Sequence, residues 1–458
     1  MPLLTRSTWV RYEPGADDPW DLRKVAHLHR RAGFGATRAE LIRDRDAGPA
    51  ASVDRLLSPP ETPTDEREAA EGLRATARTT GNIDLLKVCW LNRILHGSDP
   101  LREKLTLFWH GHFATSQKKV KSARFMDGQN ETIRNHALGD FATLLNAMTV
   151  DPAMLVWLDG VGSSKARPNE NLAREFLELF ALGPGHYTEA DVREAARAFT
   201  GWVREGREGQ FGTRPVRREA SEVDEGEKTF LGRSGRWGSA DVVRLALERP
   251  EAAVHLARAL YRGFVGEAAE PGPELLDPLA DELREHGYSI RHAVEMILRS
   301  RHFYAKGIHR QRVKSPVEFG AGLLRALEVP RTDLNPLALA AACDAQGQEL
   351  FAPPNVMGWE GGKTWINSAT LLQRENWSAD VVWGRPEQGL PPFDPLAWAS
   401  HHEVPPARAA EAWIDLLLQD DLNGEARTLI LREGRDIRPD GLRKALQLII
   451  NCPEFQLA

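Results

Sequence analysis

Residues 169–182 read NENLAREFLELFAL, and the spacing of apolar residues in this stretch decides the fold class. Leucine and phenylalanine recur three and four positions apart with charged residues between them, which is the period of an amphipathic helix. The same period returns over 85–96, 129–148 and 189–202, whereas the alternation typical of strands is scarce. We therefore predict a mainly α, multi-helical globular fold.

Capping residues mark the ends of several of these helices. Asp151, Asn169 and Thr188 each precede a helical stretch and carry a side-chain oxygen that can accept hydrogen bonds from the first free backbone N–H groups. Gly183, followed by Pro184, fits the left-handed residue that ends a helix. These residues predict three helix starts and one helix end.

Changes in composition divide the chain into five segments. They are an N-terminal arm (1–24), a first helical half (25–202), a loop or small hairpin rich in Gly, Arg and Glu (203–239), a second helical half (240–384), and a Pro-rich linker with a helical C-terminal tail (385–458). The helix at 291–303 is similar in sequence to the one at 443–455, and both end in phenylalanine. We interpret this pair as a duplicated packing helix and not as a repeat array.

The composition indicates a folded, soluble protein and excludes several classes of partner and site. The formal net charge of −6 over 458 residues disfavours binding to a phosphate backbone, so we expect no nucleic-acid partner. No stretch of about 18 apolar residues predicts a membrane span. The N-terminus lacks the apolar core of a secretory signal, so we expect a cytoplasmic protein. The 3 cysteines lack the spacing of a zinc or redox site.

The 169–182 helix carries one polar stripe on an otherwise apolar surface. At about 100° per residue, Asn171, Glu175 and Glu178 fall on one side, and Arg174 borders them. Buried polar groups need partners, because burying them unpaired is costly. Two interpretations stay open. Either Arg174 and Glu178 form an internal ion pair four residues apart, or the stripe lines a polar cavity in which a glutamate acts as a metal ligand or general acid–base group.

A second candidate is the segment 108–116, FWHGHFATS. His110 and His112 point about 200° apart on a regular helix, so they can share a metal only if the helix ends or distorts at Gly111. We expect this turn at a helix C-terminus. There a protonated histidine could complement the helix dipole. Alternatively, the pair could join a carboxylate in a two-histidine, one-carboxylate set that binds zinc, iron or manganese.

The third candidate segment, 346–370, combines paired prolines, several glycines and two tryptophans. Its Gly-Gly-Lys-Thr run lacks the spacing of a phosphate-binding loop, so we exclude nucleotide binding there. Tryptophan is unusually frequent in the chain, with 13 Trp against 5 Tyr. Because Trp109 adjoins the histidines and Trp359 lies in this loop, we expect tryptophans to wall a shared cavity, with core packing as the alternative.

Several of these segments together resemble a known family. The motifs are HLHRRAGFG (27–35), FWHGHFATS (108–116), PNENLARE (168–175), YTEADV (187–192), FTGW (199–202), KTFLG (228–232), KSP (314–316) and PNVMGW (354–359). In this order they are similar to the bacterial domain-of-unknown-function family numbered eighteen hundred. The resemblance implies a mainly helical protein, often exported and often encoded beside an uncharacterised family that looks like the sulfatase and alkaline phosphatase superfamily.

Two features depart from that family's pattern. Where the family usually has a His-Asp pair before the KTFLG run, this chain has Val223-Asp224, which weakens any mechanism that requires the histidine. The missing signal peptide argues against export of this member. The polar residues of the family's motifs nevertheless coincide with the histidine turn and with the polar stripe, and this coincidence favours a pocket built from both.

We therefore expect a polar, metal-capable pocket that performs metal-assisted hydrolysis or a related group transfer. The expected roles are His110 and His112 as ligands of a divalent metal, Glu175, Glu178 and Arg174 as catalytic residues, and Asn169, Asn171, Trp109 and Trp359 as binding residues. The alternative is a non-catalytic helical module that binds a partner protein or a cell-envelope polymer. A sulfatase- or phosphatase-like protein encoded nearby is the expected partner.

Overall fold

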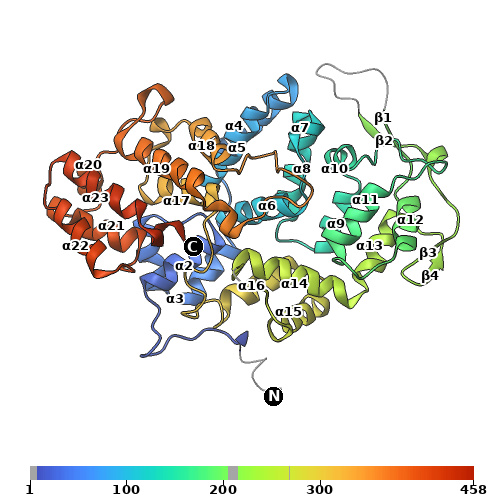
Figure 1. The fold of residues 1–458 in the computed structure, drawn as a ribbon, viewed down its shortest axis with the longest axis horizontal. Coiled ribbons are helices and arrows are strands. Elements are labelled where there is room, and N and C mark those ends of the chain that lie inside the picture. Colours follow the sequence, from blue (N-terminus) through green and yellow to red (C-terminus); the bar gives the residue numbers. More distant parts are fainter. Residues whose placement is uncertain (1–7, 205–214, 268) are drawn as a thin grey trace.

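A computed structural model describes residues 8–204, 215–267 and 269–458, and its elements are helices with two small sheets (Figure 1). This confirms the predicted mainly α fold. Among the described residues, no helix combines the length and the apolar character needed to cross a membrane. In Figure 1 the helices α20 to α23 occupy one end of an elongated molecule, and α9 to α13 lie toward the other end.

The first part of the chain folds into α2 to α12. Their bounds are α2 Leu22–Ala32, α3 Arg38–Leu57, α4 Thr64–Thr80, α5 Ile83–His96, α6 Pro100–His112, α7 Gln117–Val120, α8 Ala123–His136, α9 Phe141–Thr149, α10 Pro152–Trp157, α11 Glu170–Glu175 and α12 Glu189–Ala198. A π-helix, η1 Phe176–Ala181, continues α11 without a break.

The second part folds into α13 to α23. Their bounds are α13 Ser239–Leu247, α14 Pro250–Phe264, α15 Pro273–Glu285, α16 Ile290–Arg299, α17 Pro316–Ala326, α18 Pro336–Ala345, α19 Ser368–Trp383, α20 Pro395–His401, α21 Ala409–Leu417, α22 Gly424–Glu433 and α23 Pro439–Asn451. Short turns of 3₁₀ helix are η3 Ala220–Glu222, η4 Arg331–Asp333, η5 Gly362–Trp365, η6 Pro386–Gln388, η7 Pro406–Arg408 and η8 Pro453–Gln456.

The segment predicted as a loop or small hairpin, 203–239, contains short antiparallel strands. Strand β1 (Trp202–Arg204) pairs with β2 (Val216–Arg218), and β3 (Lys228–Phe230) pairs with β4 (Arg233–Gly235). Residues 205–214 of the predicted segment lie outside the described residues. Phe230 is fully buried in an apolar cluster, so the second hairpin is anchored to the core.

The predicted capping residues act as helix caps. The side chains of Asp151, Asn169 and Thr188 each accept a hydrogen bond from a backbone N–H two or three residues further on. At the end of η1, Gly183 adopts a φ of +83°, which is the left-handed conformation expected from the sequence. The sequence predicts these helix boundaries because each one depends on neighbouring residues alone.

The stretch of helical period at 129–148 is not one continuous helix, because it contains the end of α8 and most of α9. The carboxylate of Asp140 accepts a hydrogen bond from the Thr143 N–H at 2.7 Å and so caps the first turn of α9. The Phe141 N–H donates outside the helix, to the Tyr288 carbonyl at 3.0 Å. The apolar period continues across the break, and for this reason periodicity alone does not reveal it.

A second predicted helix, 189–202, is too long. Helix α12 ends at Ala198, and Gly201 then takes a φ of +101°, which glycine adopts readily and other residues do not. A Cβ at Gly201 would lie only 2.5 Å from the side chain of Val223. Trp202 therefore belongs to strand β1 and not to a helix.

Two apolar clusters form the core, and α6 contributes to both. The first cluster contains Trp109 of α6 together with residues of α9 and of α12 to α16. The second contains Leu107 of α6 together with residues of α5, α17 to α19 and α20 to α23. Helix α6 is therefore covered on opposite sides by different parts of the chain, and both clusters draw on residues from 25–202 and from 240–384.

The two helices of the sequence duplication, α16 and α23, are each followed by a buried phenylalanine, Phe303 and Phe455. The Phe303 ring packs against the imidazole of His27, with ring centroids 4.7 Å apart. The Phe455 ring lies under the ammonium group of Lys314, 3.7 Å from nitrogen to ring centroid. Each of these phenylalanines therefore packs against a residue of one of the motifs quoted above, His27 of 27–35 or Lys314 of 314–316.

The loop at 354–359 closes over the C-terminus of α6 through a contact between two glycines. At Gly358, which has a φ of +80°, an added Cβ would lie 2.1 Å from the carbonyl oxygen of Gly111. The ring of Trp359 lies 3.6 Å from the position of a Cβ on Gly111. Because both the conformation and the space exclude a side chain at 358, glycine is required there.

We expect Gly358→Ala to lower the free energy of unfolding by about 1–3 kcal/mol more than Gly232→Ala. Gly232 has a similar φ of +77°, but nothing lies within 4 Å of its added Cβ, so it reports the conformational cost alone. Urea unfolding followed by tryptophan fluorescence measures both losses. Equal losses in the two variants would contradict the close contact with Gly111.

Candidate functional site

The 169–182 stretch changes its helical geometry in the middle of the predicted polar stripe. Helix α11 ends at Glu175, and η1 continues it as a π-helix, at whose end the Leu182 N–H donates to the Leu177 carbonyl, five residues back, at 3.0 Å. The rotation of about 100° per residue assumed for a regular helix therefore does not hold beyond Glu175. Short π-helical segments frequently occur at functional sites.

Arg174 pairs with other acids than the one expected from the sequence. Its guanidinium lies 3.3 Å from the Glu170 carboxylate and 2.7 Å from the Glu189 carboxylate. The π-helical segment explains why the expected pair with Glu178 does not form, since a four-residue spacing no longer brings side chains above one another. All three paired side chains are partly exposed, so these ion pairs add little stability.

Glu175 and Glu178 are partly buried carboxylates that form no ion pair within the described part of the chain. The Tyr187 hydroxyl donates to Glu178 at 3.0 Å. Burial raises the pKa of Glu175, the neighbouring Glu178 raises it further, and Arg174 opposes both. A raised pKa of this kind is typical of a general acid–base group, so Glu175 keeps that role as a candidate.

His110 lies in an aromatic environment at the end of α6. Its ring centroid is 5.4 Å from Trp90, 5.7 Å from Phe351 and 5.7 Å from Trp359. Neither ring nitrogen has a hydrogen-bond partner among the described residues. Burial lowers the pKa of His110 to about 4, so the imidazole is neutral at neutral pH.

His112 faces a different group of residues. Its ring centroid lies 6.0 Å from Phe180 and 6.3 Å from His255. Burial and the neighbouring His255 lower the pKa of His112 to about 3, while the Phe180 carbonyl acts in the opposite direction. The His255 Nε2 donates to the Leu179 carbonyl at 2.8 Å. His112 and His255 thus lie at the C-terminal end of η1, where backbone carbonyl groups have no donors within the helix.

The four residues expected to bind a ligand have separate roles in the structure. Trp109 is fully buried, and its indole N–H donates to a backbone carbonyl at 3.0 Å. Trp359 packs against the second apolar cluster, and its ring lies beside His110. Asn169 caps α11, and the Asn171 amide lies 3.5 Å from the carboxylate of Asp159. Trp109 and Trp359 thus pack against different clusters.

The structure does not gather the two histidines and the glutamates into one ligand set. Within the described residues, neither histidine belongs to a group of three histidine, cysteine or acidic side chains close enough to hold one ion. A metal shared by His110, His112 and Glu175 therefore stays a prediction from the sequence.

Two other groups of side chains have ligand atoms within 4.8 Å of one another in the described chain. They are Glu282, His286 and His292, and Glu328, His401 and His402. In the second group, the His402 Nε2 lies 2.6 Å from the Glu328 carboxylate, and the His402 side chain is only 7% exposed. The side chains of the first group are 35–44% exposed, so Glu328 and His402 are less exposed than their counterparts, whereas His401 is exposed.

Glu328 occupies a position where a helix end favours glycine. It follows α17 with a φ of +54°, and the Val329 N–H donates to the Leu324 carbonyl at 3.1 Å, which closes a left-handed helix end. A residue with a Cβ costs about 1–2 kcal/mol in that conformation. Glu403 ends α20 with the same φ of +54°. Two helix C-termini, which favour a cation, therefore meet at Glu328, His401 and His402.

A pocket of about 610 Å³ adjoins this group. It lies between the end of α17, η4, the turn before α20, and α20 itself, and both Glu328 and His401 contribute to its wall. Most of the wall is apolar, including Phe393 and Trp398, with the carboxyl group of Asp333 among the few polar groups. This volume and this mixture of surfaces are typical of small-molecule sites.

Sequence reasoning missed this group for a physical reason. The adjacent histidines 401 and 402 are visible in the sequence, but their carboxylate partner comes from another helix end, and only the tertiary fold brings Glu328 to them. The one local signal is a glutamate directly after a helical stretch, which a sequence alone does not distinguish from an ordinary surface residue.

A buried charge network around Glu318 was also missed. The Glu318 carboxylate accepts a hydrogen bond from the ammonium of Lys104. It also accepts two hydrogen bonds from the Arg312 guanidinium, at 2.7 and 3.2 Å. Charged residues between apolar ones read as the solvent face of an amphipathic helix. In this protein the faces that carry Lys104 and Glu318 are both covered.

A buried chain of polar side chains anchors the segment that follows the histidine turn. The Thr115 hydroxyl donates to the Gln129 side chain, whose amide donates to the Asp151 carboxylate at 2.8 Å. Burial raises the pKa of Asp151 to about 7, although the hydrogen bonds from the Met154 N–H and from Gln129 act in the opposite direction.

Comparison with known proteins identifies a matching family model. Residues 27–457 match the model of a family described as "Protein of unknown function (DUF1800)". The matched span contains the motifs around both histidines and the polar stripe, and it also contains Glu328, His401 and His402. A search of curated proteins and a search of solved structures give no match.

Asp151→Asn is expected to remove a pH dependence of stability. Asp151 keeps its proton up to about pH 7 in the folded chain but ionises near its ordinary value of 3.8 when unfolded. The wild type therefore loses stability as pH rises from about 4 to 7, by up to about 1.4 kcal/mol per pH unit from this group. Urea unfolding at several pH values should show the variant gaining relative to the wild type across this window.

Asp140→Asn is the matched control, because Asp140 caps α9 with the same kind of hydrogen bond. It reports the general effect of replacing a capping carboxylate by an amide. If the two variants show the same trend with pH, burial of Asp151 is not the cause.

Proposed function

The chain belongs to the family described as protein of unknown function (DUF1800), and we propose that it binds a divalent metal ion through Glu328, His401 and His402 and uses this ion for hydrolysis or a related group transfer. The observation that carries the proposal is that this ligand set adjoins a pocket of about 610 Å³, whose wall includes Glu328 and His401. The reaction class is the one expected from the sequence, but the residues are different.

The donor set fits the proposed chemistry. Two imidazoles and one carboxylate form a set that zinc, iron and manganese accept, and they leave coordination positions for water and substrate. A bound cation lowers the pKa of its water and polarises a carbonyl or phosphoryl oxygen. The apolar wall near Trp398 and Phe393 suits an ester or phosphoester that carries an apolar group.

The backbone conformation of Glu328 supports a role for its side chain. Glycine would relieve the left-handed strain at this position, so the carboxylate is present despite an unfavourable conformation. Strain of this kind clusters at functional sites. The C-terminal ends of α17 and α20 add negative potential, which favours a cation at Glu328, His401 and His402.

Metal titration of protein purified without chelators tests the proposal. The wild type should bind a stoichiometric amount of zinc or manganese, and Glu328→Gln should weaken binding on the order of 10-fold or more, because it removes the anionic ligand. Metal-dependent hydrolysis of p-nitrophenyl acetate or p-nitrophenyl phosphate should fall in the same variant. Glu328→Gly, which relaxes the helix end, should lose metal while keeping or gaining thermal stability.

Two matched variants show whether the effect is specific. Glu282→Gln removes a carboxylate from the other ligand group, and Glu175→Gln removes one from the polar stripe. Both should bind metal as the wild type does. Loss of metal in Glu175→Gln but not in Glu328→Gln would instead support the site expected from the sequence. The absence of metal binding in the wild type would contradict both sites.

A non-catalytic module that binds a partner protein or a cell-envelope polymer is the second candidate. It is supported by exposed apolar side chains on the 354–359 loop and on α19, namely Met357 (69% exposed), Leu372 (54%) and Leu371 (41%). Leu371 and Leu372 are consecutive residues of α19, and adjoining exposed apolar groups mark interaction surfaces. The family resemblance makes a sulfatase- or phosphatase-like protein the expected partner.

Co-purification from the native host tests the binding role. Leu372→Ser should reduce the amount of partner retained, because it removes apolar contact area. Leu429→Ser, on α22, is the matched control, since Leu429 is also exposed but lies on another helix. A wild-type protein that elutes alone, with neither protein nor polysaccharide retained, would contradict this role.

A further inference from the structure

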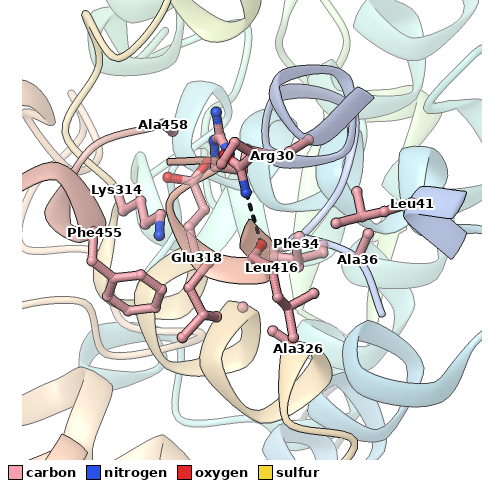
Figure 2. A pocket seen from close by; sticks show the side chains of 15 residues that line it. Arg30, Phe34, Ala36, Leu41, Lys314, Glu318, Ala326, Leu416, Phe455 and Ala458 are labelled. Carbon is pink, nitrogen blue, oxygen red and sulfur yellow. Dashed lines mark hydrogen bonds between the residues drawn. The ribbon is translucent and has the colours of Figure 1, made fainter. Parts of the chain in front are cut away.

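Two buried basic side chains border a small cavity between α2, α17 and the C-terminal segments (Figure 2). Arg30 belongs to α2, and Lys314 lies just before α17. The two residues are 7% and 5% exposed, and the cavity has a volume of about 40 Å³. Figure 2 shows that both side chains extend toward the same space from different elements. The region is separate from the proposed metal site.

Lys314 has no polar partner for its ammonium group among the described residues. The ammonium nitrogen lies over the ring of Phe455, 3.7 Å from the ring centroid. A cation–π contact stabilises a buried cation by less than the removal of an ammonium ion from water costs. The aromatic ring therefore does not compensate for burial of a charged Lys314.

Arg30 also lacks an acidic partner. One guanidinium nitrogen donates to the Gln419 side-chain oxygen at 2.7 Å, a second lies 3.2 Å from the His309 ring, and Nε has no partner. Gln419 is uncharged. Burial, together with Arg30 and other nearby arginines, lowers the pKa of His309 to about 2, so this ring is neutral as well. Nothing in these contacts neutralises the guanidinium.

The nearby carboxylates are already engaged. Glu318 contributes to the cavity wall, but it accepts hydrogen bonds from Lys104 and Arg312. Asp421 forms an ion pair with Arg310, 2.7 Å between nitrogen and oxygen. The described side chains therefore leave an excess of positive charge beside the cavity, which favours an anion from solution.

We propose that this cavity binds a small oxyanion, such as the carboxylate of a short organic acid, between Lys314 and Arg30. One water needs about 10–15 Å³ of cavity volume of this kind, so about 40 Å³ has room for roughly three to four water-sized groups, which is the size of acetate. Carboxylates and phosphates are the anions that basic side chains bind through strong, short hydrogen bonds. Phe34 and Leu416 make the remaining wall apolar, which suits a short apolar tail.

Thermal unfolding of the full chain in sodium chloride, acetate and phosphate at matched ionic strength tests this proposal. Acetate should raise the Tm of the wild type in a saturable manner. Lys314→Met keeps the length of the side chain without its charge, so it should show no acetate effect. In anion-free buffer this variant should unfold at the same or a higher temperature, because no amino group is then buried without a polar partner.

Lys118→Met is the matched control, since Lys118 has a side chain that is 72% exposed. It should keep the wild-type response to acetate. A response to phosphate and not to acetate would assign the site to inorganic phosphate and still support an oxyanion. No response of the wild type, or an equal response in Lys314→Met, would overturn the proposal.

Calorimetry on the wild type provides a test that does not depend on a variant. Burial lowers the pKa of Lys314, as do Arg30, Arg310 and Arg374, whereas Glu318 raises it. A bound anion favours the charged ammonium, so acetate binding should take up a proton from the buffer. Titrations in buffers of different ionisation enthalpy measure this uptake. Acetate binding without proton uptake would contradict the role of Lys314.

Discussion

The buried carboxylate of Glu318 is the charge on which the arrangement of the interior depends. It accepts hydrogen bonds from Lys104 of α6 and from Arg312, and Lys104 also donates to the carbonyls of Arg30 and Gly33 at the end of α2, at 3.1 and 3.0 Å. One acid thus fixes α2, α6 and α17 relative to one another. Breaking a buried ion pair of this kind typically costs about 3–5 kcal/mol, because the partner charge remains buried.

The position of α6 between the two apolar clusters explains why the histidines at its C-terminus are buried in different surroundings. Apolar residues cover both sides of this helix, so the two histidines face different cores: His110 meets aromatic rings of the second cluster, and His112 meets the end of η1 in the first. Helix α17 starts in the charge network at Glu318 and is followed at its other end by Glu328. A ligand held by a rigid, anchored helix is well placed for a metal site.

The sequence predicted those features that depend on neighbouring residues. The mainly α fold and the caps at Asp151, Asn169 and Thr188 needed only local periodicity and side-chain oxygens. The π-helix after Glu175 and the proximity of Glu328 to His402 were not predictable, because both depend on segments that meet only in the folded chain. For the same reason, the burial of charged residues such as Lys104 was not predictable.

The contact between Gly111 and Gly358 has a consequence for how the protein is made. These residues are separated by more than half of the chain, and chains leave the ribosome N-terminus first. Until Trp359 has been synthesised, His110 and Trp90 lack their cover, and this exposed aromatic surface is of the kind that chaperones bind and that promotes aggregation. Closure of so distant a pair also carries a large loop entropy. The time at which the protein becomes compact is therefore set by the arrival of its last third, and not by how fast its first helices form.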